Sequence, residues 1–354
     1  MRISWLAIVA WLFAAFAPGV AGAAVSLRVE ARPVSDPIRA YVTVTDANGN
    51  PVSNLTAADF TVLVDGVPVS APTLSQPPSQ DPTQRVSVVF VMDYSGSVVE
   101  VALDSMQQSI LRFIEAMQPG DYAAIVKFNA LNPSKASVVQ PFTEVDGGAG
   151  TSVLVSAVMA PYPDGATTGN GTNLFDGVKL AADQFSAAMA TLPNGPKAIV
   201  VASDGEENAS TVSGTSAVEL ANQLGVSIFT IGVGNVQDGR PLQIMQEFAS
   251  RTGGQYIPAP TGAQIGDAYT TISHLLNNEY VLTFPSTITD SSVHTIEVRV
   301  AGQPAPATAS FTRSTATNPP SDSGNSGGGG GGSFGLLDFI AGLGLLVLMR
   351  RRRT

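Results

Sequence analysis

Apolar and polar residues alternate along two stretches of the chain, 24–70 and 278–314. Segments such as 38–44 and 296–300 place an apolar side chain at every second position. A period of two puts successive side chains on opposite faces of a strand, so both stretches are predicted to form half-buried antiparallel strands. Asp65-Gly66 between two such segments is typical of a tight hairpin turn.

Residues 85–277 follow a different rhythm, in which short apolar runs alternate with helical patterns. Residues 86–92 are apolar almost throughout, and the next segment has apolar residues at spacings of three and four, namely Leu103, Met106, Ile110, Phe113 and Met117. The alternation continues with apolar runs at 122–128, 198–202 and 226–231 and a helical pattern at 174–185. This order predicts an α/β fold with a doubly wound, mostly parallel sheet covered by helices on both faces.

The two patterns divide the chain into segments. They are a β-module with a Pro-rich connector at 24–84, an α/β domain at 85–277, a β-segment at 278–314 and a Ser/Gly-rich linker at 315–333. The ends of a domain commonly lie near each other. We therefore hypothesise that the two β-segments join into one β-sandwich, with the α/β domain inserted between them.

Residues 1–23 have the features of a secretory signal peptide. Arg2 precedes an apolar run from Trp5 to Phe16, and Ala21-Gly22-Ala23 is a small-residue cleavage site. The apolar run is short for a bilayer span, so export is favoured over the alternative of an N-terminal membrane anchor.

The C-terminal segment 334–354 combines an apolar stretch, interrupted by Asp338, with the arginines Arg350–Arg353. Six glycines, 327–332, precede it. This order resembles the GlyGly-CTERM sorting tails of Gram-negative bacteria, which a rhombosortase-type protease cuts. The resemblance implies display at the cell surface or release after processing. The alternative is a permanent inner-membrane anchor with the body in the periplasm.

Composition excludes several classes of function. The chain of 354 residues has a net charge of −10, and its positive charge is partly in the terminal arginines, so the body repels nucleic acid and anionic lipid. Membrane contact is therefore expected only through the tail. Cysteine is absent, which excludes thiol nucleophiles and zinc–thiolate sites. The two histidines, His274 and His294, are both interpreted as structural.

Hydroxyl and carboxylate residues follow two of the predicted strands and precede one predicted helix. They are Asp93-Tyr94-Ser95-Gly96-Ser97, Ser203-Asp204-Gly205-Glu206 and Gly171-Thr172-Asn173. The carboxyl ends of parallel strands meet at one edge of the sheet, where ligands bind. An all-oxygen site with few charges suits a hard divalent cation, Mg²⁺ first, with Mn²⁺ or Ca²⁺ as alternatives.

These motifs, over roughly residues 85–277, resemble the metal-ion-dependent adhesion site of von Willebrand factor A domains. The resemblance implies five residues on or near the metal: Asp93, Ser95, Ser97, Thr172 and Asp204. It also implies an open coordination position that accepts an Asp or Glu carboxylate from a partner protein. That position is expected beside Tyr94, Asn173 and Glu206.

Simpler interpretations of the same residues stay open at this point. Asp93 and the two serines could only cap the following helix, and Asp204 could belong to an ordinary acidic turn. Thr172 is chosen over Thr167 and Thr168 because Gly-Thr-Asn-Leu runs directly into the helical pattern.

Three functions compete on this basis. The preferred one is an exported, surface-displayed adhesion module without enzymatic activity. A periplasmic, membrane-anchored scaffold or sensor is the second, and a metal-dependent hydrolase using Asp204 or Glu206 as base is the third. No histidine lies near the motif to serve as a catalytic base, so an enzyme is not expected.

Overall fold

The computed structural model describes residues 24–30, 37–47, 50–129, 136–163, 171–236, 239–311 and 313. The predicted signal peptide and sorting tail lie outside these residues. Within the described part, no helix is both long enough and apolar enough to cross a bilayer.

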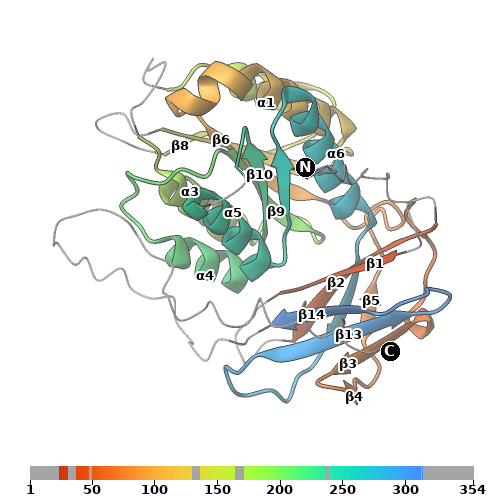
Figure 1. Cartoon of the computed structure of the whole chain (residues 1–354). Coiled ribbons are helices and arrows are strands. Elements are labelled where there is room, and N and C mark those ends of the chain that lie inside the picture. The colour runs from red at the N-terminus through yellow and green to blue at the C-terminus, as the bar shows by residue number, and fades with distance from the viewer. Residues whose placement is uncertain are drawn as a thin grey trace, which may run out of the picture.

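A six-stranded sheet forms the centre of the α/β domain (Figure 1). Its strands are β6 (Ser87–Asp93), β7 (Tyr122–Phe128), β8 (Ser137–Glu144), β9 (Lys197–Ser203), β10 (Ser227–Val233) and β11 (Tyr256–Ala259). They lie in the order β11-β10-β9-β6-β7-β8. All neighbours are parallel except β7 and β8, so the predicted doubly wound, mostly parallel sheet is confirmed.

Helices cover both faces of this sheet. One face packs against α1 (Gly96–Ala116), α2 (Ala149–Met159) and α6 (Gly262–Asn278), and the other against α3 (Leu174–Ala188), α4 (Gly214–Leu224) and α5 (Gly239–Thr252). Successive residues of β6 enter opposite cores: Val88 and Phe90 join the first, and Val89 joins the second. All seven residues of β6 are buried, which explains its uninterrupted apolar sequence.

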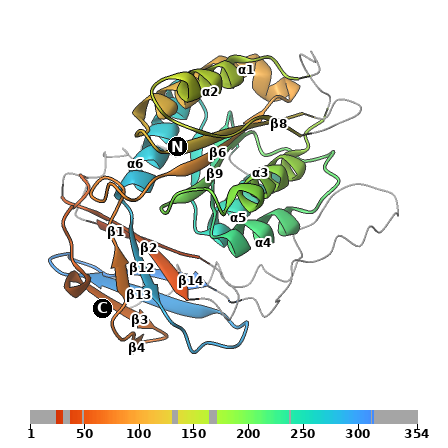
Figure 2. The ribbon, with the colours of Figure 1, turned by 180° about the vertical axis from the view of Figure 1, so that it is seen from behind.

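Two four-stranded antiparallel sheets lie below the α/β domain in both views, at lower right in Figure 1 and at lower left in Figure 2. The first has the order β1 (Ala24–Glu30), β2 (Ile38–Thr45), β12 (Tyr280–Phe284), β5 (Thr73–Ser75). The second has the order β14 (Ala307–Phe311), β13 (His294–Val300), β3 (Phe60–Val64), β4 (Val67–Pro68). A short 3-10 helix, Ala57–Asp59, precedes β3.

Both sheets contain strands from either side of the α/β domain. Val42 of β2 pairs with Tyr280 of β12, and Val62 of β3 pairs with Val298 of β13. The inner faces share one apolar core, in which the rings of Phe60 and Tyr280 lie 5.5 Å apart. The hypothesis of one sandwich with an inserted α/β domain is confirmed by these pairings.

Two elements of the central domain were not predicted from the sequence pattern. Strand β8 is an edge strand with only partly buried residues, and it contains Pro141 and an irregular register with β7. Its sequence therefore lacks both the apolar run and the strict alternation that mark a strand. Helix α2 buries only Leu154, Ala157 and Val158.

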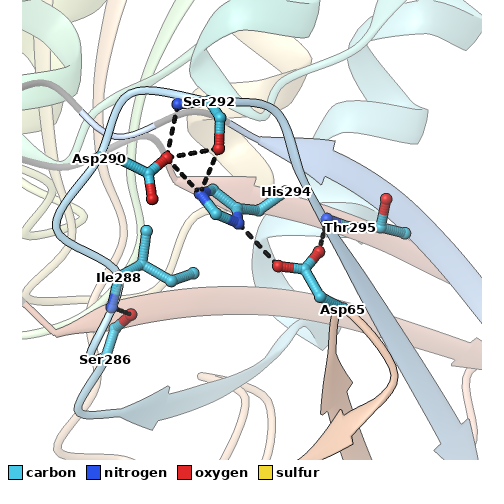
Figure 3. Close-up of polar contacts among 7 residues, drawn as sticks. All are labelled: Asp65, Ser286, Ile288, Asp290, Ser292, His294 and Thr295. Atoms are coloured by element: carbon cyan, nitrogen blue, oxygen red, sulfur yellow. Dashed lines mark hydrogen bonds and ion pairs between the residues drawn. The ribbon is translucent and has the colours of Figure 1, made fainter.

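His294, at the start of β13, links three segments of the sandwich (Figure 3). Its Nδ1 lies 2.7 Å from Asp65 Oδ2 in the β3–β4 turn, and its Nε2 lies 3.1 Å from Asp290 Oδ1. The other oxygen of Asp65 accepts a hydrogen bond from the backbone N–H of Thr295. Asp65 raises the pKa of His294 through its hydrogen bond, and Asp290 adds to this effect.

Ser292 Oγ also lies 3.1 Å from His294 Nε2, so the cluster superficially matches a Ser–His–Asp triad. However, the Ser292 hydroxyl is hydrogen-bonded to Asp290, whose carboxylate faces the same ring nitrogen. Carboxylates at both nitrogens favour the imidazolium form, which cannot accept a proton from Ser292. The geometry therefore supports a structural role for His294.

This cluster predicts a pH-dependent part of the stability. A histidine with a raised folded-state pKa stabilises the fold fully below its unfolded-state pKa, and the contribution is lost as the pH rises through the folded-state value. His294→Gln should lower the melting temperature by a few degrees at pH 6 and by less at pH 9. Equal losses at both pH values would contradict the prediction. His274→Gln, at an exposed position on α6, is the matched control.

Candidate functional site

The candidate site lies at the carboxyl edge of the central sheet. Neighbouring strands β6 and β9 end at Asp93 and Ser203, so the loops that follow them lie side by side. The segment 171–173 leads into α3 near the same loops. Topology therefore brings together the three sequence motifs.

Asp93 is the buried centre of this arrangement. Its Oδ1 accepts a hydrogen bond of 2.8 Å from the backbone N–H of Ser95, and its Oδ2 accepts one of 2.6 Å from the hydroxyl of Ser203. The side chain is fully buried. Burial raises its pKa to about 7, and the nearby charge of Asp204 adds to this, while the hydrogen bonds from Ser203 and Ser95 oppose it.

Ser95, Ser97 and Asp204 complete a connected group of oxygen atoms. Ser97 donates a hydrogen bond of 2.5 Å to Asp204 Oδ2, and the hydroxyls of Ser95 and Ser97 lie 3.4 Å apart. Ser95 occupies the N-cap position of α1, but its side chain makes no capping hydrogen bond. Simple helix capping therefore does not account for this serine.

Thr172 is buried and is held to the loop after β9 by Asn208. The Thr172 N–H donates to Asn208 Oδ1 at 2.9 Å, and the Thr172 carbonyl accepts from the N–H of Asn208 at 3.0 Å. The next residue, Asn173, is completely buried, and neither its amide oxygen nor its amide nitrogen has a hydrogen-bond partner among the described residues. Such orphaned groups are costly unless a bound group or water satisfies them.

Gly205 allows the loop after β9 to turn at the site. Its φ of +80° is in the left-handed region, and a Cβ atom there would lie 2.8 Å from the carbonyl oxygen of Pro241. Only glycine fits both the conformation and the space. The adjacent Asp204 and Glu206 depend on this turn for their positions.

Glu207 has a structural role that the sequence analysis missed. Its carboxylate accepts hydrogen bonds from the N–H groups of Phe175, Ala209 and Ser210 and from the Ser210 hydroxyl. It thereby fixes the start of α3 to the loop after β9, where the helix dipole also favours an anion. The only signal in the sequence was an acidic residue near the motif, which is too common to be diagnostic.

The residues expected beside an open coordination position lie in different environments. Glu206 is exposed, Asn173 is buried next to Thr172, and Tyr94 is 4% exposed with its side chain packed into the core. The Tyr94 hydroxyl meets Gln107 and the carbonyl of Ala160. The Tyr94 side chain therefore lies in the core, and the open coordination position beside these three residues stays a prediction.

The residues present fit a small, hard cation. Two carboxylates, of Asp93 and Asp204, lie together with serine hydroxyls, and the Asp93 carboxylate is fully buried. Oxygen donors of this kind, completed by water, suit Mg²⁺ or Mn²⁺. Within the described ranges, no three His, Asp or Glu side chains are grouped as metal ligands, so the candidate site depends on hydroxyl and water oxygens beside its two carboxylates.

Comparison with known proteins identifies one family. The model of the von Willebrand factor type A domain matches residues 87–270. A solved structure described as von Willebrand factor type A from Catenulispora acidiphila is 12% identical, with a TM-score of 0.45, and the match covers 84% of this chain and 75% of that one. An uncharacterized membrane spanning protein from Vibrio fischeri is 21% identical, with a TM-score of 0.25, and the match covers 54% of this chain and 99% of that one. No curated protein sequence matches the chain.

Proposed function

We propose that this chain, which belongs to the von Willebrand factor type A domain family, is a protein-interaction module. Its binding to a partner depends on a divalent metal. The metal is Mg²⁺, with Mn²⁺ or Ca²⁺ as alternatives. Ser95, Ser97 and Thr172 would place hydroxyl oxygens on or near it, and Asp93 and Asp204 would act largely through water. A bound cation would supply an electrophilic position for a carboxylate from a partner.

The buried carboxylate of Asp93 carries this proposal. An isolated buried anion is unfavourable, and a second carboxylate, Asp204, lies close enough to raise its pKa further. A cation would offset both penalties at once. The other proposed ligands, Ser95, Ser97 and Thr172, supply uncharged hydroxyl oxygens, so a bound metal would keep enough positive charge to attract an external Asp or Glu.

The proposed cellular location rests on the sequences of the two terminal segments. We propose export through residues 1–23 and surface display or release after cleavage near 327–333, with a role in adhesion and no catalysis. Protease added to intact cells should then remove the protein. Protection until the outer membrane is opened would instead favour the periplasmic, inner-membrane-anchored scaffold.

Thermal melting of residues 24–320 tests the metal proposal. If the dissociation constant is about 0.1 mM, 10 mM Mg²⁺ should stabilise the fold by about 2.7 kcal/mol relative to EDTA. For a domain of this size the melting temperature should rise by about 5–10 °C.

The double variant Asp93→Ala with Ser95→Ala is the control and should lose the shift. Mn²⁺ and Ca²⁺ are measured in parallel to identify the preferred ion. The absence of a shift with all three metals in the native sequence would contradict the proposal.

A further inference from the structure

A fully buried lysine lies in the strand beside β6, one position before the level of Asp93. Lys127, in β7, has no exposed side-chain surface. Its Nζ donates a hydrogen bond of 3.1 Å to the carbonyl of Val158 and a shorter one to the carbonyl of Ala160. These carbonyls are at the C-terminal end of α2, where the last turn of a helix has unsatisfied acceptors and a partial negative charge.

Gln107 and Tyr94 converge on the same helix end. Gln107 Nε2 donates to the Val158 carbonyl at 3.1 Å and to Tyr94 Oη at 3.3 Å, and Tyr94 Oη donates to the Ala160 carbonyl at 3.4 Å. Lys127 Nζ also lies 4.8 Å from the centre of the Tyr94 ring. We call Lys127, Gln107 and Tyr94 the α2 clamp.

The α2 clamp satisfies polar groups that would otherwise be costly to bury. Burial lowers the pKa of Lys127 to about 8, yet the helix carbonyls and the ring face stabilise its ammonium group. Loss of the ammonium would remove the shorter hydrogen bond to the Ala160 carbonyl and leave the longer one from Tyr94. A fully hydrogen-bonded buried network of this kind holds its side chains in one arrangement, because other arrangements leave buried polar groups without partners.

The clamp connects the segment 93–97, which carries three of the candidate ligands, to the C-terminal end of α2. Tyr94 directly follows Asp93, and its N–H donates to the carbonyl of Phe128, next to Lys127. On the other side, Lys127 Nζ and Tyr94 Oη both donate to the carbonyl of Ala160, directly after α2. Tyr162, just after α2, packs its ring 5.7 Å from that of Tyr94.

We propose that Lys127, Gln107 and Tyr94 are positioning residues for the candidate metal centre, holding the Asp93–Ser97 loop against the C-terminal end of α2. The role of the clamp in metal binding rests on the proposed function. The coupling between the Asp93–Ser97 loop and the end of α2 does not require a metal. It explains why the residue after Asp93 is a tyrosine with a buried hydroxyl.

Hydrogen exchange of the full chain in EDTA tests the coupling. Lys127→Met keeps the length of the side chain and removes the ammonium. It should accelerate amide exchange on the order of tenfold in peptides covering 94–98, where the N–H groups of Tyr94 and Ser95 donate to the Phe128 carbonyl and the Asp93 carboxylate. Tyr94→Phe, which loses one hydroxyl and keeps the ring, should act in the same direction more weakly.

The control is Thr252→Val, which removes buried hydrogen bonds at the opposite edge of the sheet. Thr252 Oγ1 accepts from the N–H of Ile228, at the amino end of β10, and donates to the carbonyl of Phe248. This variant should leave exchange in 94–98 at the native rate. Equal acceleration by Thr252→Val would overturn the proposal, because it would reveal general destabilisation. Acceleration by Lys127→Met confined to α2 would also overturn it.

Mn²⁺ binding, followed by the electron paramagnetic resonance of the free ion, separates this inference from the proposed function. Lys127→Met should weaken Mn²⁺ binding on the order of tenfold, whereas Thr252→Val should not change it. Native protein that binds no Mn²⁺ would contradict the proposed function, and the exchange data would still decide the coupling. If Lys127→Met does not fold, Tyr94→Phe provides both measurements.

Discussion

Asp93→Asn is expected to stabilise the metal-free protein by about 2–4 kcal/mol at pH 8 while abolishing its response to Mg²⁺. The native carboxylate is fully buried and has a pKa raised to about 7. At pH 8 it must be ionised in a poorly solvated position, whereas asparagine is neutral and nearly isosteric. Its amide oxygen can still accept from the Ser95 N–H.

The pH dependence has a defined sign. Because the folded-state pKa of Asp93 is above its unfolded-state value of about 4, the folded state binds the extra proton between these two values. In EDTA this group therefore makes the native protein progressively less stable as the pH rises from about 4 to about 7. Asp93→Asn should remove that part of the slope.

Urea unfolding in EDTA at several pH values measures both effects. Asp183→Asn is the matched control, because the Asp183 side chain is 44% exposed and pairs with Lys179 at the surface. It should change stability little. A fall in stability at pH 8 on Asp93→Asn would show that the buried charge is already compensated without metal.

The β-module 24–84 should not fold alone, whereas residues 85–277 should unfold cooperatively as an isolated domain. Without the C-terminal strands, β2 loses its partner β12, and β3 loses its partner β13. The remaining strands also lose the apolar side chains of Tyr280, Leu282 and Val298 from their core. Too few paired strands and too little apolar burial remain for independent stability.

Circular dichroism during heating distinguishes the fragments. A chain in which a short Gly/Ser linker replaces residues 85–277 is the control, and it should regain a cooperative transition. The linker can be short because Ser79 and Asn277 are hydrogen-bonded at the junction, with N and O 3.0 Å apart. A cooperative transition of 24–84 alone would contradict the shared sandwich.

Much of the fold was predictable because its strands have strong periodic signals. The apolar run 122–128 coincides with β7, and the predicted helical segment 174–185 lies within α3. Edge strand β8 was missed because neither of its faces is fully buried, so no apolar pattern marks it.

The grouping of Asp93, Ser95, Ser97 and Asp204 was also predictable, because parallel strands end at a common edge. The supporting residues were not. Lys127 lies in an apolar strand, and only the position of α2 explains why a cation is tolerated there. Glu207 likewise acquires its role through contacts with α3, more than thirty residues away in sequence.

The insertion of one domain into another also sets an order of events during synthesis. Asp65 and His294 are in contact although they are 229 positions apart in the chain. Contacts at such separation form late, because a long loop must close first. The strands and helices of the α/β domain contact elements that are closer to them in sequence. This domain can therefore be complete before β12 leaves the ribosome. Strands β2 and β3 are synthesised early but pair with β12 and β13 only at the end. Until then their unpaired edges are exposed to aggregation unless chaperones cover them.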